Sequence, residues 1–481
     1  MIDTSMDTPP LYQRIAGHYR GAIRTGALAP GVAMPSVRAL TRLHRVSVST
    51  ALQACRSLED EGLLEARPRS GYFVLQPRRA RLPPVPEPDF ARALDPAQYV
   101  GIHERASRYV AMSESSPIHT DFASTYAAPE AYPAAGLRSA AQRALRDDPA
   151  LLVSPVASQG SPLLRASIAR RALDAGMLIA PDEIVVTHGC IEALNVALRA
   201  VAQPGDTVAV ESPAYYGLLQ VLESLGLRAL EVPTSPTTGL SIDALAFALQ
   251  THAIKAVVAV PNYQNPLSSV MPDADKARLV ALCERHGVPL IEDDTYSVLG
   301  RDDAPLRALK SWDETGNVIH CASLRKTLAP GLRLGWMTGG RWQARIRMLR
   351  YAQSRANEAL GQLTLAGFMA SSGYERHLAR LRRSLRHQRE QTAEAIAAHW
   401  PDGTRLSLPE GSMMLWVELP NQRCGQSVFE TALAQGIRVA PGHLFSNSTR
   451  FDHFLRVGCG LPFTRELETS LQQLGRIVAE G

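Results

Sequence analysis

The first 75 residues carry a helical pattern that gives way to a strand pattern. Residues 10–26 place an apolar side chain at every fourth position, which predicts an amphipathic helix. Similar spacing predicts helices over 36–43 and 47–61, and the apolar runs 63–66 and 72–75 predict two strands. Three helices followed by a hairpin are typical of a winged helix-turn-helix.

From about residue 118 to residue 340, short β-branched runs alternate with amphipathic stretches. Apolar strands separated by helices predict an α/β fold, with a mainly parallel sheet covered by helices on both faces. The runs expected to form strands are 184–187, 207–211, 256–260, 289–292 and 318–322.

The chain after residue 340 has a mixed pattern. Two Arg-rich helices are expected over 341–357 and 374–398. Apolar runs at 413–419, 438–441 and 454–458 predict strands. Together they predict a small C-terminal α+β subdomain.

A proline-rich stretch separates the two patterned regions. Residues 76–88 read QPRRARLPPVPEP and lack apolar periodicity, so we interpret them as part of a semi-rigid linker. The predicted organisation is a winged-helix domain over 1–76, a linker over 77–115 and a large α/β domain over 116–481.

Positive charge is concentrated at the N-terminal end. Residues 1–80 hold 11 Lys and Arg against 6 Asp and Glu, which accounts for the net charge of +5, and the rest of the chain holds 40 of each. This asymmetry favours a nucleic-acid-binding end. No apolar run reaches 18 residues and no secretory start is present, so we expect a cytoplasmic protein without a membrane span. The six cysteines form no C-x-x-C pair, and no metal site is indicated.

One lysine has a sequence context that suggests chemistry. Lys326 follows the predicted strand 318–322, with Ser323 three positions before it and Arg333 seven positions after it. A lysine after a strand is usually a solvated surface group. Here a hydroxyl and a guanidinium are available to anchor a phosphate, and the cationic neighbours Arg325 and Arg333 favour a deprotonated, imine-forming amine.

Five motifs occur in a characteristic order: THGCIEAL (187–194), ESPAY (211–215), PNYQNP (261–266), IEDDTY (291–296) and SLRK (323–326). With them, residues 118–475 resemble the fold type I aminotransferases, in the branch of the aminoadipate and kynurenine enzymes. The resemblance implies the cofactor pyridoxal 5′-phosphate (PLP), held by Lys326 as a Schiff base.

The resemblance also implies roles for single residues around the cofactor phosphate. The strand-to-helix turn at Gly189 and Cys190 would bind the phosphate through backbone N–H groups, because the family's polar side chain near this turn is replaced here. The other phosphate partners expected are Ser323 and Arg333, and Arg325 is expected to be a further cofactor-binding residue beside Lys326.

The cofactor ring and the substrate have implied partners too. Tyr215 would stack on the ring, Asp293 would pair with the pyridine nitrogen, with Asp294 as the alternative acid, and Asn265 and Tyr296 would bond the phenolic oxygen. The strand containing Arg456 resembles the one whose arginine clamps a substrate α-carboxylate; the alternative is an arginine at the surface of an edge strand. The family's usual Thr-Gly after Asn265-Pro266 is replaced by Leu267 and Ser268.

The N-terminal segment resembles the GntR-type winged helices through MPSVRAL (34–40), VSVSTA (46–51) and RSGYFV (69–74). The resemblance implies contacts with double-stranded DNA from the start of the recognition helix and from the wing. The family's usual arginine is Val48 here, and Arg45 lies three positions earlier. The alternative is an accessory dimerisation domain. The implied DNA-binding residues are Arg38, Arg45, Ser47, Ser49, Thr50, Arg69 and Gly71.

A GntR-like domain joined to an aminotransferase-like domain resembles the MocR (GabR-like) transcriptional regulators. The resemblance implies a PLP-containing homodimer that binds promoter DNA and senses an amine, an amino acid or PLP through an aldimine at Lys326. An active aminotransferase with a DNA-binding appendage remains the alternative, because its whole residue set is present. A DNA-binding repressor with an inactive cofactor domain is a third possibility.

Overall fold

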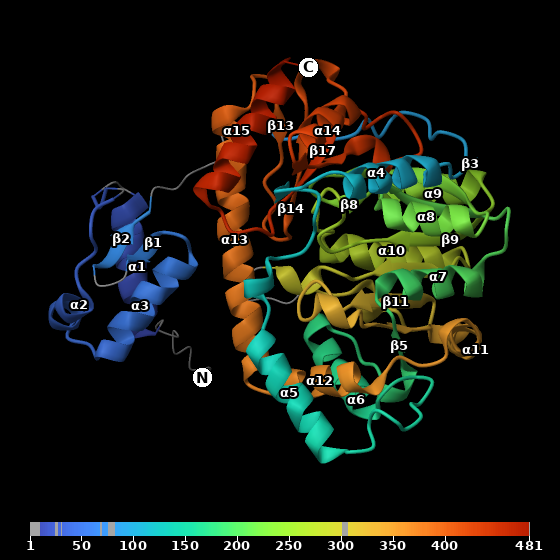
Figure 1. The fold of residues 1–481 in the computed structure, drawn as a ribbon, viewed down its shortest axis with the longest axis horizontal. Helices are drawn as coiled ribbons and strands as arrows, with labels where there is room; N and C mark the ends of the chain where they lie inside the picture. The colour runs from blue at the N-terminus through green and yellow to red at the C-terminus, as the bar shows by residue number, and fades with distance from the viewer. Residues whose placement is uncertain are drawn as a thin grey trace, which may run out of the picture. The chain divides into compact units, whose positions relative to one another are not determined.

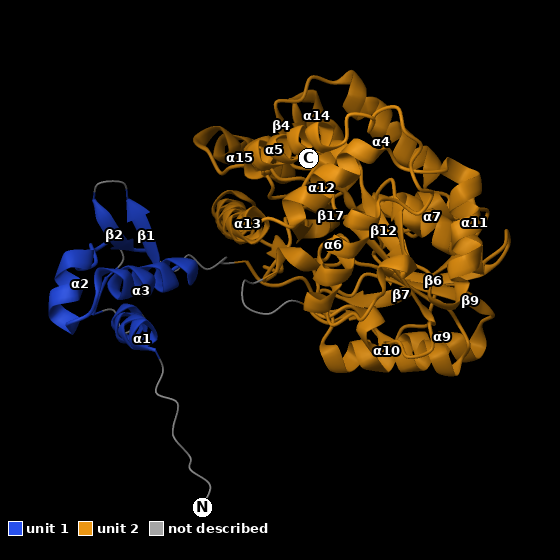
Figure 2. Ribbon diagram, turned by 90° about the horizontal axis from the view of Figure 1, so that it is seen from below, with its two compact units in different colours: residues 1–79 blue, residues 80–481 orange. Residues whose placement is uncertain are grey.

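The computed structural model describes residues 10–24, 27–29, 31–67, 70–75, 82–300 and 306–480. The chain divides into two compact units, Met1–Arg79 and Ala80–Gly481, and each is described by itself (Figures 1 and 2). In these described ranges, no helix is both long and apolar enough to cross a bilayer.

The small unit contains the predicted helices and hairpin. Its elements are α1 (Leu11–Arg24), α2 (Val37–His44), α3 (Val48–Asp60), β1 (Leu64–Arg67) and β2 (Gly71–Val74). The apolar stripe of α1 is buried against α3, and the two strands pair antiparallel. The core includes Ile15, Tyr19, Leu40, Leu58, Leu64 and Val74.

Within the described residues, the central sheet of the large unit has nine strands in the order β3-β7-β6-β9-β10-β11-β12-β5, with β8 paired to β7. From β7 to β11 neighbouring strands run parallel, whereas β12 runs antiparallel to both of its neighbours. The mainly parallel sheet predicted from the sequence is therefore confirmed. The strands are β3 (Gln98–Tyr99), β5 (Ile184–Thr187), β6 (Thr207–Ser212), β7 (Arg228–Ser235), β8 (Gly239–Leu240), β9 (Ile254–Ala259), β10 (Leu290–Asp293), β11 (Val318–Ser323) and β12 (Gly335–Thr338).

Helices cover both faces of this sheet (Figure 2). Alternate strand residues point to opposite faces, so Val208 packs with one set of helices and Ala209 with the other. The first set is α7 (Cys190–Val201), α8 (Tyr216–Ser224) and α11 (Gln343–Ser354), and the second is α9 (Ile242–Thr251) and α10 (Asp273–Arg285). At the β5–β12 end, α5 (Ala134–Asp147), α6 (Pro162–Ala172) and α12 (Ala359–Met369) complete the cover.

The C-terminal subdomain is the predicted α+β structure. An antiparallel sheet has the order β13-β14-β17-β16 and packs against the subdomain's helices. Its strands are β13 (Arg405–Leu406), β14 (Met414–Glu418), β16 (Ala440–Pro441) and β17 (Phe454–Gly458). Its helices are α13 (Gly373–His399), α14 (Gly425–Ala434) and α15 (Arg465–Glu480), and β4 (Thr120–Asp121) pairs with β15 (Ile437–Arg438) beside them.

The predicted linker 77–115 is too long. The Leu406 amide donates to the Pro83 carbonyl at 2.9 Å, and Val85 is buried in the C-terminal core. Strand β3 joins the central sheet, and α4 (His103–Ser115) follows it. Because of these contacts, the described residues from 82 onward belong to the large unit, although their proline content is typical of a linker.

Candidate functional site

The predicted cofactor residues gather at one edge of the central sheet. Strands β6, β9, β10 and β11 are parallel, so their carboxyl ends and the loops after them meet there. A cavity at this edge is lined by eight of the predicted residues: Cys190, Tyr215, Asn265, Asp293, Tyr296, Ser323, Arg325 and Lys326.

Lys326 is half-buried at the wall of this cavity. Its Nζ donates to Thr125 Oγ1 at 2.9 Å and lies 3.5 Å from the centre of the Tyr126 ring. Burial, followed by the nearby positive charges of Arg456 and Arg325, lowers the lysine pKa to about 7. The amine is therefore substantially deprotonated near neutral pH, as imine formation requires.

The structure separates the two neighbouring acids, Asp293 and Asp294. Asp293 lines the cavity, and its Oδ1 accepts hydrogen bonds from Thr295 Oγ1 at 2.5 Å and Cys190 Sγ at 3.2 Å. Asp294 Oδ2 instead lies 3.8 Å from His320 Nε2, at a position that does not line the cavity. Burial raises the pKa of Asp293, and the hydrogen bonds oppose that shift. Of the two acids, Asp293 is therefore the one that faces the cavity.

Gly189 lies where β5 passes into α7, in the turn predicted to hold the phosphate. Its φ of +83° suits glycine, and a Cβ there would come within 3.2 Å of Arg325 Cδ. Arg325 Nε is buried without a hydrogen-bond partner in the described residues, so it can serve an anion. Ser323 Oγ accepts from the Arg325 amide at 3.2 Å. Arg333 is exposed and does not line the cavity.

Arg456, on β17, reaches this region from the C-terminal subdomain. Its Nη1 donates to Asn265 Oδ1 at 2.9 Å and its Nη2 to the Ala123 carbonyl at 2.7 Å. The residue is 3% exposed, which rules out the alternative of a surface arginine. Its Nε has no partner among the described residues.

The two adjacent tyrosines have different surroundings. Tyr215 lines the cavity, whereas Tyr216 packs edge-on against Phe445, with ring centres 5.9 Å apart. Tyr296 donates from its hydroxyl to Thr125 Oγ1 at 3.3 Å. Thr125 thus connects Tyr296 with Lys326.

Sequence reasoning missed Thr125 and Tyr126. They lie about 200 positions before Lys326, in a short irregular segment that carries no periodic or spacing signal. Nearby in the sequence, the one hint of a functional role is that a polar residue, Thr125, is followed by an aromatic one, Tyr126, between β4 and α5.

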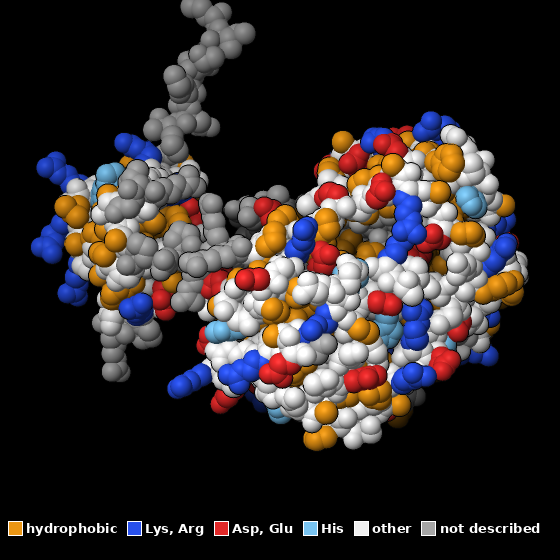
Figure 3. Space-filling view, turned by 90° about the horizontal axis from the view of Figure 1, so that it is seen from above, with side chains coloured by type: hydrophobic (Ala, Val, Ile, Leu, Met, Phe, Trp, Pro, Cys, Tyr) orange, Lys and Arg blue, Asp and Glu red, His pale blue; other side chains and the backbone are white. Residues whose placement is uncertain are grey.

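The predicted DNA-binding residues lie on the surface of the small unit. Ser47 caps α3, with Oγ accepting from the Thr50 amide at 3.2 Å. Arg45 takes the left-handed conformation, with φ of 50°, between α2 and α3. The side chains of Arg38, Arg45, Ser47 and Ser49 are exposed, as is Gly71 at the start of β2, whereas Thr50 is half-buried. Figure 3 shows basic side chains spread over this unit. Arg69 lies outside the described residues.

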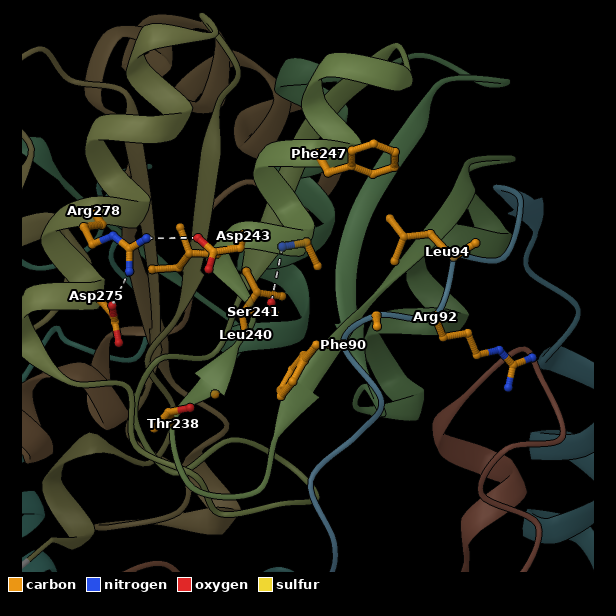
Figure 4. Close-up of a pocket in the computed structure, with 15 residues that line it drawn as sticks. Phe90, Arg92, Leu94, Thr238, Leu240, Ser241, Asp243, Phe247, Asp275 and Arg278 are labelled. Carbon is orange, nitrogen blue, oxygen red and sulfur yellow. Dashed lines mark hydrogen bonds and ion pairs between the residues drawn. The ribbon is translucent and has the colours of Figure 1, made fainter.

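Another hollow in the large unit lies beside α9 and α10 (Figure 4), and it shares no lining residue with the cavity at Lys326. Phe90 and Phe247 line it, and three of its charged side chains are paired with each other. Arg278 donates to Asp243 and to Asp275, at 3.0 Å in each case. The cavity at Lys326, with its low-pKa lysine and the unpartnered guanidinium nitrogen of Arg325, is therefore the better candidate for chemistry.

Each of the two units matches a known protein family. Residues 131–468 match the family described as aminotransferase class I and II, and residues 11–74 match the gntR family of bacterial regulatory proteins. The chain is 36% identical over 474 residues to the uncharacterized HTH-type transcriptional regulator YjiR of Escherichia coli K12, covering 97% of this chain and 98% of that protein. The chain belongs to the GntR-type transcriptional regulators that carry an aminotransferase class I and II domain.

Other relatives agree with this assignment and with the MocR architecture. The regulator is 36% identical to the uncharacterized HTH-type transcriptional regulator YdcR of the same strain, with 98% and 99% of the two chains covered. The large unit resembles the α-aminoadipate aminotransferase LysN of Thermus thermophilus complexed with N-(5′-phosphopyridoxyl)-L-leucine. The TM-score is 0.71 at 26% identity, covering 78% of this chain and 96% of LysN.

The cofactor of this regulator is PLP. The cavity fits that group on its own chemistry. It combines a deprotonatable amine at Lys326, a buried carboxylate at Asp293 and an unpartnered buried nitrogen on Arg325.

Proposed function

We propose that this regulator binds double-stranded promoter DNA through its small unit, and that a small amine, an amino acid or PLP bound at the Lys326 cavity changes that binding. One observation carries the proposal. The same chain holds a recognition helix, α3, whose start is exposed and polar, and a cavity with a lysine that can lose its proton. The family assignment unites the two units in one regulator.

On the DNA side, Ser47, Ser49 and Thr50 lie in the first turn of α3, where backbone N–H groups and hydroxyls suit phosphate and base edges. Arg38 is exposed on α2 and adds a positive charge. The localised net charge of +5 in residues 1–80 strengthens non-specific attraction to DNA.

On the effector side, Arg456 has an unpartnered, buried Nε beside two satisfied nitrogens. A carboxylate at this guanidinium would satisfy it, which favours amino acids over simple amines. PLP, when bound, supplies the electrophilic carbon that an effector amine attacks. Lys326 holds or releases a proton at Nζ, with Thr125 and Tyr296 hydrogen-bonded beside it.

We further propose that the regulator works as a homodimer in the cytoplasm, where promoter DNA lies. A two-fold symmetric protein presents two recognition helices to the two half-sites of an operator.

The test is DNA binding by the full-length PLP-loaded protein, measured by fluorescence anisotropy with DNA from upstream of its own gene. Arg38→Ala is expected to weaken binding about tenfold, and the matched control Arg14→Ala, an exposed arginine on α1, by less than about twofold. Addition of amino acids or amines should change the affinity of the unsubstituted protein. If amino donors are instead turned over at ordinary enzyme rates and the upstream DNA is not bound, the protein is an aminotransferase and the proposal fails.

A further inference from the structure

The turn predicted to hold the phosphate contains a carboxylate. Glu192 lies in the first turn of α7, and its Oε2 accepts from the His188 amide at 2.6 Å and lies 3.2 Å from His188 Nδ1. The Glu192 side chain therefore braces residues 188–192 from within. A negative charge in the first turn of a helix is compatible with the helix dipole, but it repels a phosphate bound at the same helix end.

A buried arginine lies against this carboxylate. Arg350, on α11, is 1% exposed, and its Nε lies 3.3 Å from Glu192 Oε2 as an ion pair. Ser354 donates to the other carboxylate oxygen, Oε1. Burial would raise the pKa of Glu192, but hydrogen bonds from Ser354 and the His188 amide, followed by the charge of Arg350, hold it below its ordinary value. The carboxylate is therefore ionised.

The rest of the Arg350 guanidinium is held by the chain after α11. Nη1 donates to Ser354 Oγ at 2.6 Å and to the Arg355 carbonyl at 2.5 Å, and Nη2 donates to Asn357 Oδ1 at 2.5 Å. Arg355 is a non-glycine residue with φ of 59° and ψ of −111°, a sparsely populated conformation. Arg350 is thus fixed in place, with its positive charge directed at Glu192.

We propose that Arg350 is a positioning residue for the cofactor phosphate: it neutralises Glu192, so that this carboxylate can brace the 188–192 turn without repelling the phosphate. The inference rests on the proposed placement of the phosphate at Gly189 and Cys190. Arg350 acts through Glu192, so the need for Arg350 disappears when Glu192 loses its charge.

The experiment measures binding of PLP and of pyridoxal, which lacks the phosphate, to the full-length protein freed of cofactor. Arg350→Met is expected to weaken PLP binding about tenfold or more, because it leaves a buried carboxylate uncompensated beside the phosphate. Pyridoxal binding should change by less than about twofold, since that ligand carries no anion. Glu192→Gln keeps an acceptor for the His188 amide and should stay within about threefold of the unsubstituted protein.

The decisive variant is the double substitution Glu192→Gln with Arg350→Met. It should recover PLP affinity to within about threefold of the unsubstituted protein, because the coupling between contacting charges is removed together with both partners. If the double variant binds PLP as weakly as Arg350→Met alone, or if Arg350→Met weakens pyridoxal to the same extent, Arg350 serves only to support residues 354–357 and the proposal is overturned.

Two comparisons keep the test decisive. If Arg350→Met does not give a folded protein, Arg350→Lys and Arg350→Gln replace it in the test. Arg350→Lys retains the charge and should bind PLP within about threefold of the unsubstituted protein, whereas Arg350→Gln should lose about tenfold in PLP affinity. An equal loss of PLP affinity in both variants overturns the proposal. If the unsubstituted protein binds pyridoxal as tightly as PLP, the placement of the phosphate is itself wrong. DNA binding by each variant is the separate readout of the proposed function.

Discussion

The two units of this regulator expose their functional residues very differently. In the small unit, Arg38, Ser47 and Ser49 lie on the surface, on α2 or at the start of α3. In the large unit, Asp293 and Arg456 are 8% and 3% exposed, and they come from different strands.

The difference follows from the two ligands. DNA is large and must be met at a surface, where each contact is screened and contributes modestly. A small cofactor is enclosed, so burial changes the acidity of the groups around it and each group contributes more. A substitution in the cavity should therefore have a larger effect on effector response than a substitution on α3 has on DNA binding.

Lys326→Ala should have the largest effect. The protein should lose the visible absorbance band of lysine-bound PLP and its whole response to effectors, because no other described group lines the cavity with a primary amine. DNA affinity should remain within about twofold, since DNA is bound by the other unit. Absorbance and DNA anisotropy measure the two effects, with Lys255→Ala, an exposed lysine on β9, as the control. Retention of the band by Lys326→Ala would show that another residue holds the cofactor.

Arg456→Met should have the next largest effect. The concentration of amino acid needed for half-maximal change in DNA binding should rise about 30-fold, because a charge-assisted contact with the carboxylate is lost. An amine without a carboxylate should need nearly the same concentration as before. The dose–response curves of such a ligand pair decide the point, and an equal shift for both would remove Arg456 from carboxylate recognition.

Loading with PLP should depend on pH through Lys326, whose pKa is lowered to about 7. The free amine is the reactive form, so the initial rate of band formation should rise roughly tenfold between pH 6 and pH 8 and level off above. Arg456→Met removes one of the positive charges that lower this pKa and should move the midpoint to higher pH. A midpoint above pH 9 in the unsubstituted protein would contradict the burial of the amine.

Ser47→Ala should have the smallest effect. Removing the cap of α3 should lower the free energy of unfolding of the small unit by about 1 kcal/mol. Ser36→Ala removes the equivalent cap of α2, where Ser36 Oγ accepts from the Ala39 amide at 3.2 Å, and should destabilise the unit to a similar extent. Denaturation followed in both variants gives the stability change. A further loss of DNA affinity in Ser47→Ala alone would assign Ser47 a direct DNA contact; equal affinities would leave it as a cap.

Several elements could be predicted because their signals are local. The strand 184–187 was predicted with the bounds that the structure gives, and the helices of the small unit differ from prediction by one or two residues at each end. The strand β12 and the helix α12 were not predicted. β12 begins at Gly335, whose Cβ, if present, would lie 2.7 Å from Gly189 Cα, so a contact between distant segments sets its place.

The residues of the cavity and around it also fall into two groups, those that a local signal predicts and those that it does not. Lys326, Asp293 and Asn265 stand in motifs with recognisable spacing. Thr125, Tyr126 and the pairing of Glu192 with Arg350 have no such spacing, because their partners lie far away in the chain. The predicted linker was too long for a related reason. Its proline content can be seen in the local sequence, whereas the pairing of β3 with β7 joins segments far apart in the chain.

The sequence by itself determined the two-domain plan, the α/β class of the large domain, the position of the cofactor lysine and the concentration of positive charge at one end. These properties depend on periodicity, composition and short motifs, which neighbouring residues encode. Only the tertiary structure decided that Asp293 rather than Asp294 faces the cavity, that Arg456 is buried, and that Arg350 lies against Glu192. Those outcomes depend on which face of a strand or helix is covered and by what, and folding sets this by bringing distant segments together.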